Sequence, residues 1–226
     1  NLGIETLELG ERISEIMHVP VHVENDVNVA AVGATEFVEH VDGNATVVFL
    51  NFGTGLAAGL VRDGQAEHGY SGCIGEIGHL PVDPNGFACP CGQRGCLETV
   101  ASGGAVAKLW PSANPPMPDL IRKARQGDEH ANDVLGKVAH GMGDVIQIVA
   151  QAYDPQRIII GGGMAKTGND LIEVIQAELS RRAEGCRFLN TLDIASKIRI
   201  AAVDKPIGAI GAALAAKRAQ LGKQTM

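Results

Sequence analysis

The chain has 226 residues and a formal net charge of −7, with 45% hydrophobic, 20% charged and 4% aromatic residues. This balance excludes an intrinsically disordered chain, and an acidic segment without a long Lys/Arg run excludes a nucleic-acid surface within it. The longest apolar stretch, residues 206–216, is too short to span a bilayer, and no signal-peptide pattern opens the chain. We therefore expect a cytoplasmic protein with no membrane partner.

In the first half of the chain, apolar residues recur with helical or strand spacing between turn signals. Pro20 ends the first predicted helix, and Asn25 or Asp26 is expected to cap the second. The elements expected here are a helix over about 9–17, a strand over 19–23, a helix from 24–26 to about 38, strands over 45–50 and 56–62, and an irregular segment over 66–103.

The second half of the chain is predicted to be mostly helical. A linker over 111–118 opens it, and Asp128 is placed to cap its longest helix. The elements expected here are helices over 119–126 and 129–152, a strand over 158–160, a helix over 170–184, a strand over 197–202 and a last helix over 206–218. This alternation of strands and helices predicts an α/β fold in which helices cover a sheet.

Three of the five cysteines lie close together, as Cys89, Cys91 and Cys96, and His79 precedes them by ten residues. Thiolate sulfur and imidazole nitrogen are the ligands that Zn²⁺ takes in closed four-ligand structural sites. The alternative is a set of unrelated buried thiols, and a disulfide is geometrically poor at a two-residue separation. The spacing favours a zinc loop that leaves the other two cysteines uninvolved.

Carboxylates accompany both the cysteine cluster and the second predicted helix. Asp26 follows Asn25 at a strand-to-helix junction, where α/β proteins place polar groups; it either accepts a proton from a substrate alcohol or merely caps the helix. Glu76 lies between glycines ahead of His79, and Glu98 directly follows the cysteines. A metal loop that held both glutamates near one histidine would form a polyol-binding pocket; the alternative for each is a solvated loop residue.

Two glycine-rich turns follow predicted strands. The amides and hydroxyl of Gly53-Thr54-Gly55 are able to hold a phosphate, although such a turn also serves a plain hairpin. Gly161-Gly162-Gly163 follows a buried strand and precedes helical residues, as in nucleotide-binding turns, but it does not match Gly-x-Gly-x-x-Gly. Neither turn fits a P-loop.

Together these motifs resemble the ROK family, which contains bacterial sugar kinases and sugar-responsive NagC/XylR-type transcriptional regulators. The resemblance covers nearly the whole chain, in family order. It is carried by five stretches: Glu24-Asn25-Asp26-Val27-Asn28, Phe52-Gly53-Thr54-Gly55, Gly75-Glu76-Ile77-Gly78-His79-Leu80, the segment from Cys89 to Glu98, and Ile159-Ile160-Gly161-Gly162-Gly163.

The resemblance implies an actin-like ATPase (ribonuclease H-like) fold of two lobes. On this interpretation, residues 1–20 are the tail of a missing first lobe, residues 21–205 form the larger lobe with a zinc loop at 76–98, and residues 206–226 are a C-terminal helix that returns to the first lobe. A fragment of this kind is expected to lack a complete ATP site and to be inactive alone.

The resemblance also implies a function, an ATP-dependent kinase acting on a hexose or N-acetylhexosamine in a homo-oligomer. Asp26 would be the catalytic base and Zn²⁺ a structural ion. The implied sugar ligands are Asn25, Asp26, Glu76, His79 and Glu98; the implied zinc ligands are His79, Cys89, Cys91 and Cys96; Gly53, Thr54 and Gly55 would face the phosphates of ATP with Mg²⁺, and Gly161, Gly162 and Gly163 the adenosine. The alternative is a sugar-sensing repressor that binds DNA only through a domain outside this chain. The intact glycine turns favour the kinase.

Overall fold

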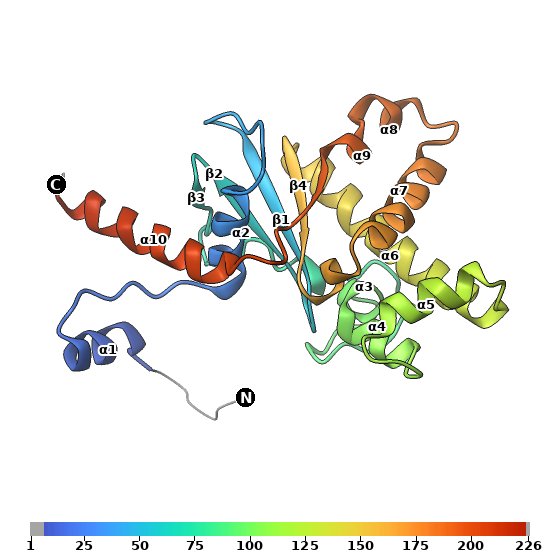
Figure 1. The fold of residues 1–226 in the computed structure, drawn as a ribbon, viewed down its shortest axis with the longest axis horizontal. Helices are drawn as coiled ribbons and strands as arrows, with labels where there is room; N and C mark the ends of the chain where they lie inside the picture. The colour runs from blue at the N-terminus through green and yellow to red at the C-terminus, as the bar shows by residue number, and fades with distance from the viewer. Residues whose placement is uncertain (1–6, 225–226) are drawn as a thin grey trace.

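A five-stranded sheet, of order β3-β2-β1-β4-β5, lies at the centre of the computed structural model, which describes residues 7–224 (Figure 1). The first three strands pair antiparallel, whereas β4 and β5 run parallel to β1. The strands are β1 (Thr46–Phe52), β2 (Leu56–Arg62), β3 (Gln65–Ala66), β4 (Arg157–Gly161) and β5 (Ile198–Ile200).

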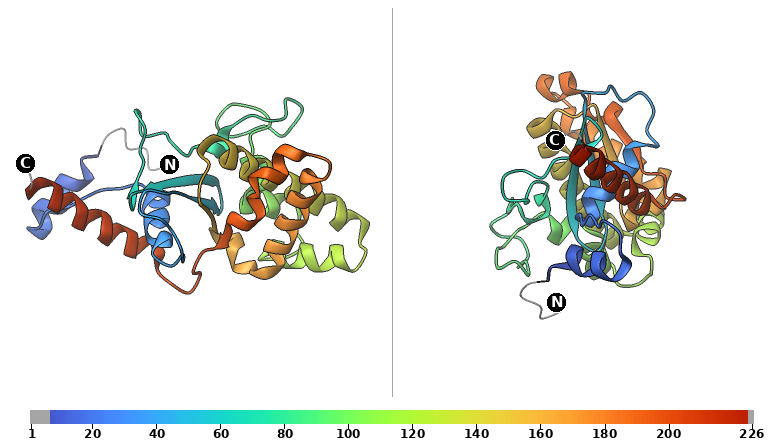
Figure 2. Two further views of the ribbon diagram at one scale, coloured as in Figure 1. Left: turned by 90° about the horizontal axis from the view of Figure 1, so that it is seen from above. Right: turned by 90° about the vertical axis from the view of Figure 1, so that its left-hand side faces the viewer.

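Helices cover both faces of this sheet, with α2 and α10 on one side and the group from α3 to α9 on the other (Figure 2). Helix α1 lies apart from the sheet, and none of its residues is buried. The helices are α1 (Leu9–Met17), α2 (Asp26–Thr35), α3 (Glu98–Ala101), α4 (Gly103–Leu109), α5 (Pro116–Arg125), α6 (Glu129–Tyr153), α7 (Asn169–Ala183), α8 (Arg187–Leu192), α9 (Ile194–Lys197) and α10 (Ile207–Gln224), with short 3-10 turns η1 (Ile77–His79) and η2 (Gly163–Thr167).

Strand β1 is buried on both faces, as a central strand between two helical layers must be. Val47 and Phe49 point to the layer of α2 and α10, whereas Val48 and Leu50 point to the layer that contains α6. The predicted α/β architecture is therefore confirmed. Across residues 7–224, no helix combines the length and the apolar composition that a membrane span requires.

Two glycines allow α2 and α10 to pack at unusually close range. A Cβ atom added at Gly33 would lie 1.9 Å from the carbonyl oxygen of Ile207, and one added at Gly211 would lie 1.7 Å from the carbonyl oxygen of Val29. Both distances are far below any real contact, so the backbones of the two helices touch directly. This packing fixes α2, and with it the segment that carries Asn25 and Asp26.

Several predicted elements differ from those found. The strand over 19–23 is wrong: these residues lie outside the sheet, and Val19 and Val23 are half exposed. β-branched residues favour a strand only where a neighbouring strand and a buried face exist. The linker over 111–118 is shorter than predicted, because Pro116 begins α5, a position that proline favours.

The chain also contains more helix than predicted. Helix α3 lies in the segment over 66–103 that was predicted to be irregular, and α4, α8 and α9 were not among the predicted helices. Lys197 ends α9 instead of beginning β5. The last helix continues to Gln224, beyond residue 218, where the apolar spacing ended it, and within the range 206–226 that the resemblance implied. Residues 1–6 of the predicted lobe tail and residues 225–226 lie outside the described part of the chain.

Candidate functional site

Four side chains converge in and around the loop between η1 and α3. The ligand atoms of His79, Cys89, Cys91 and Cys96 all lie within 4.8 Å of one another. Cys89 Sγ is 3.7 Å from His79 Nδ1, and Cys91 Sγ is 3.7 Å from Cys96 Sγ. A tetrahedral Zn²⁺ with Zn–S bonds of about 2.3 Å separates its sulfur ligands by about 3.8 Å. The four residues therefore fit a closed structural zinc site.

The loop builds this arrangement with its own polar groups. The amide of Cys89 donates to the carbonyl of Gln93 at 2.9 Å. The side-chain Nε2 of Gln93 donates to the carbonyl of His79 at 2.9 Å and to Cys91 Sγ at 3.5 Å. Because Nδ1 of His79 faces the sulfur atoms, Nε2 on the far side of the ring points away from the metal position.

The thiols of this loop differ in acidity. Hydrogen bonds from the backbone and the side chain of Gln93 lower the pKa of the Cys91 thiol to about 6. Burial, together with the neighbouring cysteines, raises the pKa of the Cys96 thiol to about 12. Since zinc binds thiolates, Cys91 is a ready ligand at neutral pH, whereas Cys96 would release its proton to solvent on binding the ion.

Residues 67–79 run along the outer edge of β2 and attach the zinc loop to the sheet. The amide of Glu67 donates to the carbonyl of Leu60 at 2.9 Å, and the amide of Ala58 donates to the carbonyl of Gly75 at 2.8 Å. Gly75 has a φ of +92°, and a Cβ there would lie 1.9 Å from the carbonyl oxygen of Ala58. This close approach places Glu76, whose side chain is exposed, beside the first half of β2.

The predicted cap of α2 is confirmed as Asn25. Its Oδ1 accepts hydrogen bonds from the amides of Val27 at 2.9 Å and Asn28 at 3.1 Å. Asp26 follows at the first helical position, and its Oδ1 accepts from the amide of Val27 at 2.9 Å. Within residues 7–224, these side-chain hydrogen bonds use only Oδ1 of each residue, which leaves Nδ2 of Asn25 and Oδ2 of Asp26 for a ligand.

Glu98 lies next to the Gly-Thr-Gly turn rather than in solvent. Its Oε2 accepts a hydrogen bond of 2.9 Å from the amide of Leu56, the residue directly after the turn. Glu98 and Thr54 also line a cavity of about 550 Å³ that extends to Phe87 and Lys108. One carboxylate oxygen of Glu98 thus fixes the turn, and the residue lies at the wall of this cavity.

The two glycine turns leave the sheet side by side. Strands β1 and β4 are parallel, with Asn51 opposite Gly161, so the turns follow the carboxyl ends of adjacent strands. A Cβ atom added at Gly162, which has a φ of +77°, would lie 2.6 Å from the amide nitrogen of Gly53. The amide of Gly103 at the start of α4 closes the far side by donating to the carbonyl of Gly53 at 2.7 Å.

The structure thus unites the predicted zinc ligands, and it brings Glu98 and both glycine turns to one end of the sheet. Asp26 and Glu76 are exposed, and within the described residues no hydrogen bond joins either of them to Glu98. A sugar pocket shared by these three carboxylates therefore stays a prediction. A strand over 19–23 was expected to position Asp26, but no such strand forms. The cap at Asn25 positions Asp26 instead.

The sequence pattern singled out neither His68 nor Glu24 as an individual site residue, although they form a close polar contact. Nε2 of His68 lies 2.6 Å from Oε2 of Glu24, across 44 residues of sequence. Glu24 directly precedes the Asn-Asp pair, which is the one local signal that pointed to it. The partner in the loop after β3 is visible only in the fold.

Known proteins resemble the chain over most of its length. A model of the ROK family matches residues 1–219. A glucokinase of Halalkalibacterium halodurans is 32% identical, over 93% of this chain and 68% of its own length. The DNA-binding transcriptional repressor Mlc of Escherichia coli (strain K12) is 29% identical, over 80% of this chain and 47% of its own length.

A solved structure gives the same result for the fold. The ROK family glucokinase of Streptomyces griseus, crystallised with glucose and AMPPNP, superposes with a TM-score of 0.74 at 29% identity. The match covers 93% of this chain and 72% of that protein. The predicted actin-like ATPase fold is confirmed.

Proposed function

The chain belongs to the ROK family, and on that premise we propose that it forms the larger lobe of an ATP-dependent kinase for a hexose or N-acetylhexosamine. The chain spans about two thirds of the length of the glucokinase that it resembles, 68%. We propose that a first lobe, to which residues 1–20 and 206–226 connect, completes the ATP site in the full-length protein.

The observation that carries the kinase proposal is the junction of the two glycine turns beside Glu98. The turn at 53–55 and the turn at 161–163 form one backbone surface at the carboxyl ends of β1 and β4. Backbone amides of glycine turns at such an edge suit the phosphates and adenosine of a nucleotide. Glu98 links this surface to the zinc loop through the amide of Leu56.

In the proposed mechanism, Oδ2 of Asp26 accepts the proton of the attacking sugar hydroxyl. Asn25, Glu76 and Glu98 hold the other hydroxyls. Nε2 of His79 binds the sugar as well, because its Nδ1 faces the zinc ligands and fixes the tautomer. Bound Mg²⁺ would neutralise charge on the phosphoryl group of ATP, and Zn²⁺ would hold the loop without chemistry.

The second candidate is a sugar-sensing repressor, and the likeness to Mlc favours it. Such a protein would use the same pocket as a sensor and would contact DNA through a separate domain. It has no need of an adenosine turn, so the intact glycines at 161–163 weigh toward the kinase. A homo-oligomer, which the resemblance also implied, stays a prediction for both.

A coupled assay of ADP release on the full-length protein, with common hexoses and N-acetylhexosamines, tests the kinase proposal. Asp26→Asn should lower kcat about 10²–10⁴-fold because the amide cannot accept a proton, while hexose affinity stays within a few-fold. Asp128→Asn is the matched control: Asp128 caps α6 through the amide of Ala131, and asparagine caps equally well. A wild-type protein that binds hexose but releases no ADP would instead be the sensor.

A further inference from the structure

Glu24 is tied into the predicted sugar-binding segment although it is not among the predicted ligands. Its side chain is only 11% exposed. Oε1 accepts a hydrogen bond of 2.8 Å from the amide of Asn25 and one of 3.1 Å from Nδ2 of Asn28. One carboxylate oxygen therefore holds both the cap and the first turn of α2, where negative charge is favourable.

The second oxygen of Glu24 faces groups from other elements. Oε2 lies 2.6 Å from His68 Nε2, in the loop after β3, and 3.8 Å from His22 Nε2. Glu24 and the two histidines line a cavity of about 500 Å³, and Arg218 of α10 lines it as well. Burial alone would raise the pKa of Glu24, but hydrogen bonds from His68, Asn28 and Asn25 outweigh it and lower the pKa. The carboxylate is therefore charged at neutral pH.

The loop that His68 opens leads directly to Glu76. At its start, Glu67 is hydrogen-bonded to β2 through the carbonyl of Leu60, and His68 follows. At its end, the carbonyl of Gly75 accepts from the amide of Ala58. The contact between Glu24 and His68 thus joins the two segments that carry the predicted sugar ligands, one on α2 and the other on the edge of β2.

We propose that Glu24 is a positioning residue that, through His68, holds the segment of Asn25 and Asp26 in register with the loop leading to Glu76. This inference rests on the proposed hexose site and adds a residue to it. Glu24 and His68 touch no substrate atom; they fix the relative position of groups that do. A displacement of about 1 Å between reacting groups is enough to cost about 100-fold in rate.

Steady-state kinetics of the full-length protein test this role. His68→Ala and Glu24→Gln should each lower kcat about 10- to 100-fold, with the KM for ATP changed less than about threefold. His68→Gln should recover activity to within about threefold of wild type, because its amide nitrogen also donates to Glu24. The double variant should lose no more than the worse single variant, since both remove one contact.

The exposed pair Glu39 and His40, at 3.9 Å, provides the matched control, and His40→Ala should leave kcat unchanged. If the wild type phosphorylates a hexose, and the kcat values of His68→Ala and Glu24→Gln are both within twofold of the wild-type kcat, the positioning role is wrong and the kinase proposal stands. If the wild type binds hexose without phosphorylating it, calorimetry decides: the role predicts at least tenfold weaker hexose binding in His68→Ala, and unchanged affinity refutes it. A wild type that binds no hexose overturns both proposals.

Discussion

The four residues of the zinc loop do different work, although all four fit one ion. Cys89 and Cys96 are buried, Cys91 is exposed, and His79 is partly buried. A structural zinc site contributes directly to the free energy of folding, because the ligand set does not exist in the unfolded chain. The buried ligands therefore matter both for zinc affinity and for the order of the loop that ends at Glu98.

Cys89→Ser should reduce bound zinc from about one equivalent per chain to near zero, because serine is a poor ligand in a closed sulfur-rich site. The same variant should show a lower melting temperature, since the loop between η1 and α3 loses its crosslink. Elemental analysis and thermal melts of purified protein measure both effects. Cys73→Ser is the control: Cys73 is exposed and outside the cluster, so zinc content should stay the same and stability should change by less than about 0.5 kcal/mol. Full zinc occupancy in Cys89→Ser would exclude this ligand set.

Single residues were predictable where the information is local. The predicted zinc ligands all lie between His79 and Cys96, so their spacing already favoured a metal loop, and the structure brings the four together. The hydrogen bond from the amide of Leu56 to Glu98 spans 42 residues, and the contact between Glu24 and His68 spans 44. Such contacts depend on which strands become neighbours, and the sequence pattern does not specify that.

Among the helices and strands, too, features set by neighbouring residues were predicted correctly, and features that depend on distant segments were not. The caps at Asn25 and Asp128 are set by neighbouring residues, and both are found. The strand over 19–23 failed because a strand needs a partner, and the order of the sheet leaves none there. Helices α8 and α9 are short and meet at Asp193, which has a φ of +44°, so neither shows a clear helical period.

The close packing of α2 against α10 predicts that two glycines of α10, Gly208 and Gly211, differ in their tolerance of alanine. Gly211→Ala should lower the free energy of unfolding by about 2 kcal/mol or more, because the new methyl group would overlap the backbone of Val29. Gly208→Ala is the matched control, since a Cβ at Gly208 meets nothing within 4 Å. There the better helix propensity of alanine should stabilise α10 by up to about 1 kcal/mol. Urea denaturation measures both; equal effects would mean that the helices are not packed this closely.

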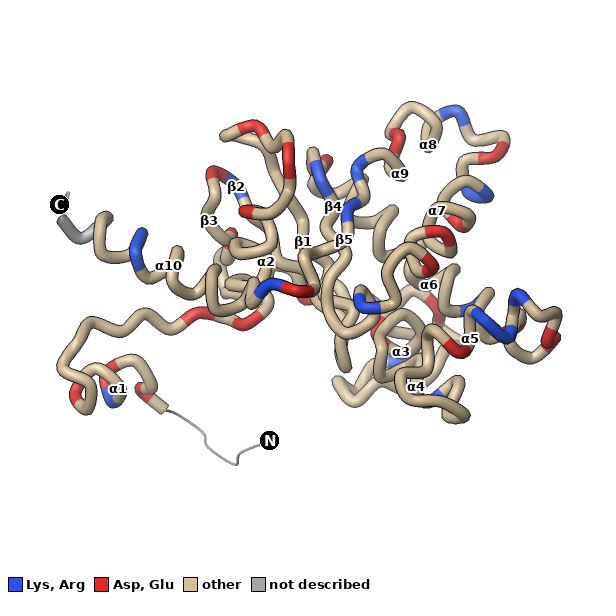
Figure 3. The backbone as a smooth tube through the Cα atoms, viewed as in Figure 1, with Lys and Arg blue, Asp and Glu red and all other residues tan. Residues whose placement is uncertain are grey.

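At the scale of the whole molecule, positively and negatively charged residues both occur along the helices of the layer that contains α6 (Figure 3). Arg125 of α5 pairs with Asp170 at 2.6 Å and Glu173 at 2.7 Å, both on α7. These pairs are about half exposed, and surface pairs of this kind contribute little, about 0–1 kcal/mol. The ion pairs between α6 and α7 are more buried, so losing one of their partners should change the free energy of unfolding more.

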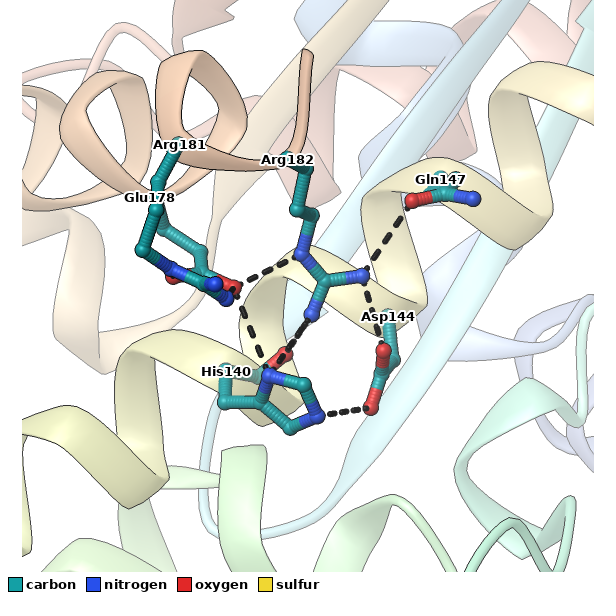
Figure 4. Close-up of polar contacts among 6 residues, drawn as sticks. All are labelled: His140, Asp144, Gln147, Glu178, Arg181 and Arg182. Carbon is teal, nitrogen blue, oxygen red and sulfur yellow. Dashed lines mark hydrogen bonds and ion pairs between the residues drawn. The ribbon is translucent and has the colours of Figure 1, made fainter. Parts of the chain in front are cut away.

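Arg182 of α7 lies over α6 and contacts it through several groups (Figure 4). On α6, its Nη1 pairs with Asp144 Oδ1 at 2.8 Å and its Nη2 donates to the carbonyl of His140 at 2.7 Å. Its Nε donates to Oε1 of Glu178, on its own helix, at 2.7 Å. The side chains of Glu178 and Arg182 are only 8% and 11% exposed. Removing one partner from such a buried pair leaves the other charge uncompensated.

This network links the stability of the whole molecule to pH. Burial alone would raise the pKa of Glu178, but hydrogen bonds from Arg181 and Arg182 outweigh it and lower the pKa from 4.5 to about 2. A carboxyl group whose pKa is lowered by folding stabilises the native state above its unfolded pKa. That stabilisation is lost as the pH falls from about 5 toward the folded pKa of about 2.

Glu178→Gln should therefore destabilise the protein at pH 7, by on the order of 3 kcal/mol at most, and by progressively less as the pH falls below about 4.5. The difference shrinks because the unfolded chain, in which Glu178 has its ordinary pKa of 4.5, takes up a proton as the pH falls, whereas Glu178 of the folded protein, with a pKa of about 2, stays charged. Protonation therefore stabilises the unfolded wild type, and the uncharged glutamine of the variant has no such dependence on pH. Urea denaturation at pH 7, 5 and 4 measures it, and Glu173→Gln on the same helix, at an exposed position, should show a small difference at every pH. If the difference between wild type and Glu178→Gln is the same at all three pH values, the charge on Glu178 does not stabilise the junction of α6 and α7.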